Sequence, residues 1–210
     1  QADVDRFLPP YEPLYTLHPD KPITMGAYGM PELYTEAKYA QEMALLNSKV
    51  EVKEVMAQFS KEFGRSYSIV ETYNIEKADT VFMALGSINE NIKTAIDKLK
   101  EEGKELGLVS PRLFRPFPAA ELLDVLKEKK KVVVLERVMP AGAMNGPLFN
   151  EMASLAVSHG LEAQLENFIF GLGGRDVEPE ELMETYEQVV SSTKVSHADN
   201  KNYGVIGVRS

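Results

Sequence analysis

The stretch Thr80-Val81-Phe82-Met83-Ala84-Leu85-Gly86-Ser87 decides the fold. Its first six residues form a short run, rich in apolar side chains, that does not alternate with charged ones. Such a run is typical of a strand covered on both faces. Helical spacing follows over residues 88–102. A buried strand that leads into a helix is the repeating unit of an α/β sheet.

The same unit recurs toward the C-terminus. Further buried strands are predicted at Leu106–Val109, Val132–Leu135 and Leu165–Phe170, with an additional strand at Tyr67–Tyr73. Helical patterns separate or follow them at residues 119–129, 147–159 and 178–191. This alternation predicts right-handed crossovers and a doubly wound, mainly parallel, Rossmann-like sheet flanked by helices.

The first part of the chain differs in composition. Residues 1–34 are interrupted by prolines, which exclude a long regular element: Pro9, Pro10, Pro13, Pro19, Pro22 and Pro31. The apolar content of residues 1–34 predicts an ordered strap that packs against another protein surface rather than a free linker. A long helix is expected from Thr35 to about Phe63, ending at Gly64 and interrupted near Asn47 and Ser48. We therefore expect a connector at 1–34, an α/β domain at 35–192 and a docking tail at 193–210.

Charge and composition exclude several classes of protein. Acidic residues outnumber Lys and Arg by 32 to 23, for a net charge of -9, which argues against nucleic acid as a partner. The chain has no cysteine, so it forms no disulfide, thiolate nucleophile or cysteine-ligated cluster. No apolar run is long enough to span a bilayer, and we expect a cytoplasmic location without a membrane partner. Gln1 in place of Met indicates a processed, tag-derived or truncated start.

Gly86 and Ser87 stand between a predicted strand and a predicted helix. Ser87 can therefore cap the helix, and the free N–H groups there can donate hydrogen bonds to a phosphate or carboxylate. The spacing is not that of a dinucleotide fingerprint, so a plain helix cap is favoured over a cofactor-binding site.

The segment Gly171-Leu172-Gly173-Gly174-Arg175-Asp176 also follows a strand. As a dinucleotide motif it is weak, because the next helix begins some residues later, near Pro179. We interpret it as a tight turn in which Arg175 and Asp176 form an ion pair, and we count both among the interface candidates.

Arg112-Leu113-Phe114-Arg115-Pro116-Phe117-Pro118 follows the end of another predicted strand, at the edge where doubly wound sheets bind ligands. Two arginines on one extended segment can face the same way and clamp a carboxylate or phosphate. The aromatic residues beside them favour an interface instead, with Arg112, Arg115 and Phe117 as its anchors.

Residues that usually carry catalysis or metal binding are scattered. His18, His159 and His197 lack ligand spacing, so the sequence predicts no metal and no catalytic triad. Paired carboxylates such as Glu101 and Glu102 fall on polar helix faces or ends. No catalytic residue is assigned.

Several stretches together resemble pyruvate:ferredoxin oxidoreductases and their 2-oxoacid relatives. The similarity is carried by 84–87, 95–99, 101–109 and 112–118, with support from 63–67, 134–137, 146–149 and 171–176. It extends over nearly the whole chain. One departure is Glu136-Arg137, where many relatives have an Asp-Arg pair.

The resemblance implies the second domain of the alpha subunit, preceded by the end of the first domain and similar to the C-terminal domain of transketolase. It implies an enzyme complex that oxidatively decarboxylates a 2-oxoacid such as pyruvate, usually to an acyl-coenzyme A, and passes electrons to ferredoxin. Thiamine diphosphate and iron-sulfur clusters would lie on other domains or subunits, with no cofactor in this chain. Its role would be non-catalytic assembly with the thiamine-binding and iron-sulfur subunits, and it would meet ferredoxin only indirectly, within an oligomer.

Two alternatives stay open at this point. The chain can be a small-molecule module that binds a nucleotide, coenzyme A or an acidic metabolite through Ser87 and Arg115. It can also be only a stable folded piece, in which case exposed apolar surface and self-association are expected.

Overall fold

The computed structural model describes residues 1–26, 28–191 and 203–208. The chain divides into two compact units, Gln1–Tyr67 and Ser68–Ser210. The long helix expected from Thr35 lies in the first of these units. None of that helix's residues is buried. The domain bounds expected from the sequence, 1–34, 35–192 and 193–210, stay a prediction.

The first unit consists of two helices and an irregular strap. Helix α1 spans Ala2–Phe7 and α2 spans Pro31–Phe63. α2 is continuous through Asn47 and Ser48, so the expected interruption is wrong, and it ends at Gly64 in the left-handed conformation, as expected. The Phe7 ring packs edge-on against those of Phe59 and Phe63, at 5.8 and 5.4 Å.

The second unit is built on a six-stranded sheet in the order β1-β3-β2-β4-β5-β6. The strands are β1 Val70–Tyr73, β2 Thr80–Ala84, β3 Leu106–Pro111, β4 Lys131–Glu136, β5 Gln164–Ile169 and β6 Gly204–Val205. β1 runs antiparallel to β3 at one edge, and the other pairs are parallel. The α/β, mainly parallel sheet expected from the sequence is confirmed.

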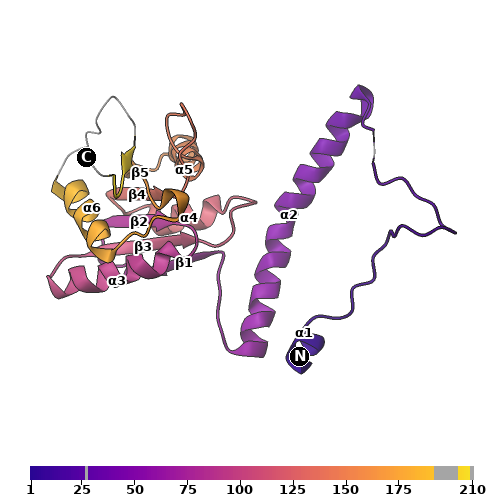
Figure 1. Ribbon diagram of the computed structural model, residues 1–210, viewed down its shortest axis with the longest axis horizontal. Helices are drawn as coiled ribbons and strands as arrows, with labels where there is room; N and C mark the ends of the chain where they lie inside the picture. The colour runs from indigo at the N-terminus through magenta and orange to yellow at the C-terminus, as the bar shows by residue number, and fades with distance from the viewer. Residues whose placement is uncertain (27, 192–202, 209–210) are drawn as a thin grey trace. The chain divides into compact units, whose positions relative to one another are not determined.

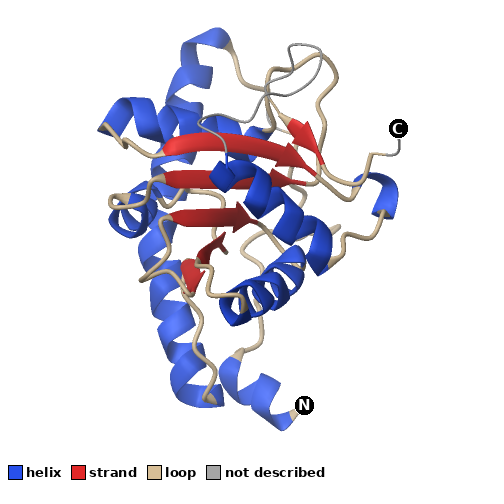
Figure 2. Cartoon of the chain, turned by 90° about the vertical axis from the view of Figure 1, so that its left-hand side faces the viewer, coloured by secondary structure: helices blue, strands red, loops and turns tan. Residues whose placement is uncertain are grey.

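Helices cover both faces of this sheet (Figures 1 and 2). One face carries α3, Ile88–Glu101, and α6, Pro179–Ser191; the other carries α4, Ala119–Leu126, and α5, Pro147–His159. A short 3-10 turn, Leu172–Gly174, follows β5. All five residues of β2 are buried, which accounts for the uninterrupted run in its sequence.

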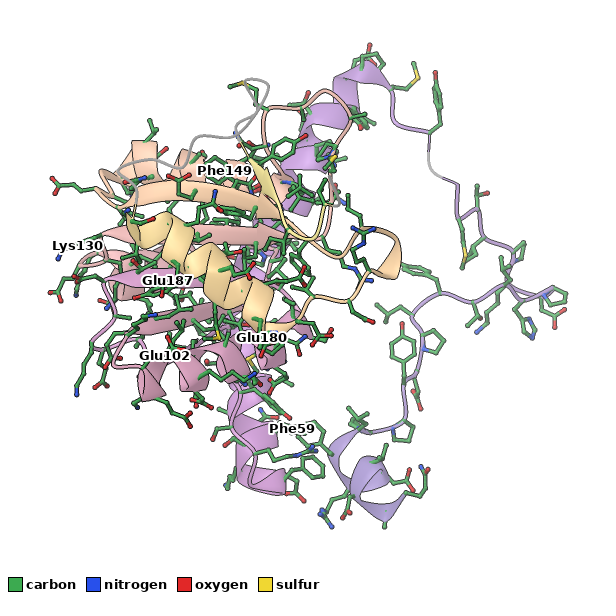
Figure 3. The ribbon with its side chains drawn as sticks, turned by 60° about the vertical axis from the view of Figure 1, so that its left-hand side comes forward. Phe59, Glu102, Lys130, Phe149, Glu180 and Glu187 are labelled. Carbon is green, nitrogen blue, oxygen red and sulfur yellow. The ribbon has the colours of Figure 1, made fainter. Side chains whose placement is uncertain are left out.

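Two exposed ion pairs join α6 to α3 and to the turn after α3, and a third lies within that turn. The Lys98 ammonium lies 2.5 Å from Glu180, and that of Lys104 lies 2.7 Å from Glu102 and 2.6 Å from Glu187. Figure 3 labels the three carboxylates. These pairs are solvent-exposed and contribute little each, so the buried apolar cluster between the helices and the sheet supplies most of the stabilisation.

The described part of the expected tail, residues 203–208, docks on the α/β unit itself. β6 pairs with the end of β5, and the Ile206 side chain is buried in the core beside α6. The rest of the expected tail, 193–202 and 209–210, lies outside the described residues.

Candidate functional site at the carboxyl edge of the sheet

The carboxyl ends of β2, β4 and β5 form the edge at which doubly wound sheets place their sites. β2 leads into α3 on one face, whereas its neighbour β4 leads into α5 on the other. Adjacent strands whose helices leave to opposite faces define a topological switch point. The loops 85–87, 137–146 and 170–178 therefore meet at the position where a ligand or partner is expected.

A buried carboxylate occupies the start of α5. Glu136, at the end of β4, is only 5% exposed. Its Oε2 accepts the N–H of Leu148 at 2.6 Å, and its Oε1 accepts the N–H of Phe149 at 3.1 Å. Oε1 also accepts the side-chain amide of Asn167 at 3.1 Å, and Asn167 Oδ1 accepts the N–H of Gly146 at 3.2 Å. We call these five residues the carboxylate cap.

Gly146 is required by this arrangement. A Cβ atom added there would lie 2.2 Å from Glu136 Oε1 and 2.4 Å from its Cδ. The Gly146 backbone, with φ -77° and ψ 165°, suits any residue, so the restriction comes from space alone. Because the carboxylate of Glu136 already satisfies the first N–H groups of α5, this helix N-terminus is not open to an external anion.

Burial raises the pKa of Glu136 above its ordinary value, against the opposing effect of the hydrogen bonds from Leu148, Phe149 and Asn167. The native state therefore holds this proton more tightly than the unfolded chain does. The stability that protonated Glu136 contributes is fully present below its pKa in the unfolded chain. This stability is lost as the pH rises through its raised pKa in the native state.

We expect the effect to appear in a comparison with Glu136→Gln, which cannot titrate. Urea unfolding of both proteins from about pH 4 to about pH 8 should show the wild type losing stability relative to the variant as the pH rises. A difference that stays constant, or that changes in the opposite direction, would mean that the native pKa of Glu136 is not raised.

Ser87 is located as predicted but does not act as predicted. It precedes the first residue of α3, yet its side chain makes no capping hydrogen bond. The backbone of Ser87 is helical, with φ -67° and ψ -21°, whereas a capping residue has extended dihedrals. Gly86 has a φ of +84°, which favours glycine at the turn. A cofactor role for Gly86 and Ser87 stays a prediction.

The two arginines after β3 do not form a clamp. Arg112 donates to the Glu71 carboxylate on β1 at 2.8 Å, and Arg115 donates to Glu151 on α5 at 2.5 Å. The chain bends at Arg112 and again at Arg115, so the segment between them is not the extended strand that a clamp was expected to need. Arg115 also stacks on the Phe114 ring at 4.2 Å. The guanidinium groups therefore serve different neighbours.

Phe117 packs beneath this segment. Its ring meets that of Phe114 edge-on, with 6.2 Å between centroids, and it contacts the core on the α4 and α5 face. Phe117 is thus a partly buried packing residue in this chain, and its role in an interface stays a prediction.

Two arginines at this edge, Arg175 in the turn after β5 and Arg137 after β4, donate to backbone carbonyls. Arg175 donates to the Gly207 carbonyl beyond β6, and the described residues show no ion pair between Arg175 and Asp176, so that expectation is wrong. Neighbouring side chains in extended backbone point apart, which explains the missing pair. Arg137, after β4, donates from Nε to the Gly171 carbonyl at 2.8 Å.

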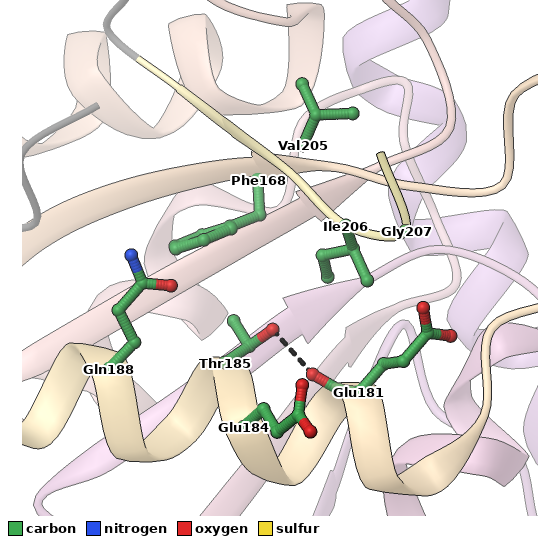
Figure 4. A pocket seen from close by; sticks show the side chains of 8 residues that line it. All are labelled: Phe168, Glu181, Glu184, Thr185, Gln188, Val205, Ile206 and Gly207. Carbon is green, nitrogen blue, oxygen red and sulfur yellow. Dashed lines mark hydrogen bonds between the residues drawn. The ribbon is translucent and has the colours of Figure 1, made fainter. Parts of the chain in front are cut away.

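A small cavity of about 180 Å³ opens between α6 and the β6 segment (Figure 4). Its polar lining comes mainly from one face of α6, including Glu181, Glu184 and Thr185, and the Thr185 hydroxyl donates to the Glu181 carbonyl. Within the described ranges, no group of three or more His, Cys, Asp or Glu side chains is placed to hold a metal ion. None of the helices described is both long and apolar enough to cross a membrane.

Comparison with known proteins identifies the family. Residues 78–182 match the family described as pyruvate:ferredoxin oxidoreductase core domain II. The chain belongs to this family. The matched region begins just before β2 and ends inside α6, so it contains the switch point and the carboxylate cap.

Curated relatives of this domain II chain are subunits of 2-oxoacid oxidoreductases. The pyruvate synthase subunit PorA of Methanothermobacter thermautotrophicus is 36% identical over 92% of this chain and 48% of its own length. The ketoisovalerate oxidoreductase subunit VorA of Pyrococcus horikoshii is 40% identical over 93% of this chain and 50% of its own length. The chain therefore spans about half the length of these relatives.

Among solved structures, a 2-oxoglutarate:ferredoxin oxidoreductase from Magnetococcus marinus is 21% identical and has a TM-score of 0.43, with 62% of this chain and 20% of that chain covered. The alpha chain of a probable 2-oxoacid ferredoxin oxidoreductase from Thermoplasma acidophilum is 22% identical, with a TM-score of 0.36 over 59% of this chain and 97% of that one.

Sequence reasoning missed Asn167 and did not connect Gly146 with Glu136. The available signals were a polar residue inside the apolar run 165–170 and a Gly-Pro pair before a helix.

Proposed function

We propose that this chain is a non-catalytic assembly domain of a thiamine-diphosphate-dependent 2-oxoacid:ferredoxin oxidoreductase. The observation that carries the proposal is the domain II match over residues 78–182, together with relatives that are subunits of pyruvate and ketoisovalerate enzymes. The complex would decarboxylate a 2-oxoacid such as pyruvate oxidatively, transfer the acyl group to coenzyme A and reduce ferredoxin in the cytoplasm.

The polar groups of the domain support a structural role. Glu136 and Asn167 satisfy the backbone of α5, and Arg112 and Arg115 are paired with carboxylates of the same unit. A catalytic acid or base must be directed at a reacting group instead. The 210 residues contain no cysteine, so iron-sulfur clusters of the complex would be held by other polypeptide segments.

The first unit supports the presence of protein partners. Helix α2 has no buried residue, and large apolar side chains are exposed on more than one of its sides: Leu33, Tyr34, Tyr39, Met43, Leu45, Leu46, Val50 and Val55. A helix that is apolar on several sides is usually enclosed by other elements. We propose that further domains or subunits of the enzyme enclose it.

Reconstitution tests the proposal. The chain alone, the remaining domains and subunits alone, and the complete mixture are assayed for 2-oxoacid-dependent reduction of a viologen dye. Activity in the complete mixture only is the expected result. Turnover by this chain alone, or full activity without it, would overturn the assignment.

We also propose that Arg112 and Arg115 anchor contacts between domains or subunits. Both are exposed, so their ion pairs within the unit contribute about 1 kcal/mol or less each. The double variant Arg112→Ala/Arg115→Ala should therefore stay folded and assemble at least about tenfold more weakly. Assembly is measured by co-purification and sedimentation, with Lys93→Ala/Lys127→Ala as control. If the double variant assembles as tightly as the wild type, the two arginines do not anchor contacts between subunits and serve only the stability of this domain.

A further inference from the structure

The loops at the switch point carry exposed apolar side chains. Leu85 follows β2, Val138, Met139 and Met144 lie in the loop after β4, and Leu172 lies in the turn after β5. Met144 is 71% exposed, and the other four are between 38% and 41% exposed. Since β2, β4 and β5 are consecutive in the sheet, their carboxyl ends lie at one edge. We call these five residues with Arg137 the edge surface.

Arg137 is held in position at this surface. Its Nε donates to the Gly171 carbonyl at 2.8 Å. A Cβ at Gly171 would lie 3.3 Å from that nitrogen, so this glycine leaves room for the guanidinium group, whereas a Cβ at Gly174 would make an ordinary contact of 3.7 Å with Nη2. Both glycines have positive φ, which also favours glycine there. An arginine fixed in this way loses less conformational freedom when it binds.

Among the described residues, Arg137 has no ion-pair partner. Within the described ranges, no carboxylate lies within ion-pair distance of its guanidinium, although the chain carries a net charge of -9. By contrast, Arg112 and Arg115 each have a glutamate partner. A fixed guanidinium with no acidic partner among the described residues, on an edge whose loops also carry exposed apolar side chains, is complementary to a carboxylate that has apolar neighbours.

We infer that the edge surface is the binding site for a protein partner that presents a carboxylate flanked by apolar side chains. The inference rests on the proposed function, under which the partner is another domain or subunit of the oxidoreductase. Arginine and methionine are enriched at protein interfaces, and central arginines often dominate their energetics. A second copy of this chain fits poorly, because a two-fold contact centred on this surface would bring two Arg137 side chains together.

The test uses the full chain in the complete set of subunits. Arg137→Glu should weaken assembly by about tenfold or more, whereas Lys100→Glu should leave it unchanged. Lys100 is exposed near the end of α3, at the opposite edge of the sheet, so its replacement makes the same change in charge elsewhere. A second variant, Val138→Ser/Met139→Ser, should weaken assembly without changing charge, with Val157→Ser on α5 as its control. Circular dichroism and thermal unfolding confirm that each variant is folded.

Each outcome decides between explanations. If the wild-type chain assembles and the folded variants Arg137→Glu and Val138→Ser/Met139→Ser join the other subunits equally tightly, the edge surface is not the binding site. The proposed function would still stand. Failure of the wild-type chain to join any subunit would overturn the proposed function and this inference with it. Binding of inorganic phosphate or coenzyme A that is lost in Arg137→Glu, with assembly unchanged, would assign the surface to a small anion. If the wild-type chain alone sediments as a dimer, and Arg137→Glu dissociates this dimer without changing subunit assembly, the edge surface binds a second copy of the chain.

Discussion

Glu136→Ala is expected to lower the free energy of unfolding by about 3–5 kcal/mol. The substitution removes the acceptor for the N–H groups of Leu148 and Phe149 and for the side-chain amide of Asn167. Glu136 is 5% exposed, and Leu148 and Asn167 are buried with it, so water does not readily replace the lost partners. Urea unfolding followed by circular dichroism measures the loss.

Two further variants separate the hydrogen bonds from other effects. Glu101→Ala removes a carboxylate from the exposed end of α3 and should change stability by less than about 0.5 kcal/mol. Glu136→Asp keeps a carboxylate on a shorter side chain and should lose less stability than Glu136→Ala. If Glu136→Ala were as mild as Glu101→Ala, the carboxylate would not be stabilising α5.

The regular elements could be predicted because their signals are local. The apolar run Thr80–Leu85 predicted β2, and Gly64 correctly marked the end of α2. Strands could be predicted from the buried apolar runs because a central parallel strand is covered on both faces and excludes charged residues along most of its length. The helix interruption at Asn47 and Ser48 was wrong because their low helix propensity is a weak preference.

The side-chain contacts could not be predicted, since they depend on the sheet register. Val134 pairs with Asn167 across β4 and β5, and this pairing brings the Asn167 amide within 3.1 Å of Glu136. Nothing in the local sequence indicates that Asn167 and Glu136, which are 31 residues apart, form a hydrogen bond. Arg175 shows the same limit, because its partner is the distant carbonyl of Gly207 rather than the adjacent Asp176.

The family resemblance supplied what local patterns could not. It placed residues 134–137, 146–149 and 171–176 in one domain, and the structure brings these three segments together at the carboxyl edge. It did not distinguish the residues that cap α5 from those that face outward. That distinction required the positions of Glu136 and Arg137, which are consecutive in sequence but respectively buried and exposed.

Gly146→Ala is expected to be the second most damaging of the substitutions considered, with a loss of about 2–3 kcal/mol. The added methyl group would lie 2.2 Å from Glu136 Oε1, so either the carboxylate or the start of α5 must move and the hydrogen bonds of the cap must lengthen. Gly26→Ala is the matched control, because a Cβ there meets no atom within 4 Å. Its effect should be small.

A double-mutant cycle shows whether this loss comes from the predicted collision. The three nearest atoms to the added Cβ all belong to the Glu136 carboxylate. In a Glu136→Ala background those atoms are gone, so Gly146→Ala should cost less than about 1 kcal/mol and the two losses should not add. Additive losses would place the strain of Gly146→Ala elsewhere in the turn before α5. A coupling close to the full cost of Gly146→Ala would show that this glycine is needed because a buried carboxylate occupies the space in front of the helix.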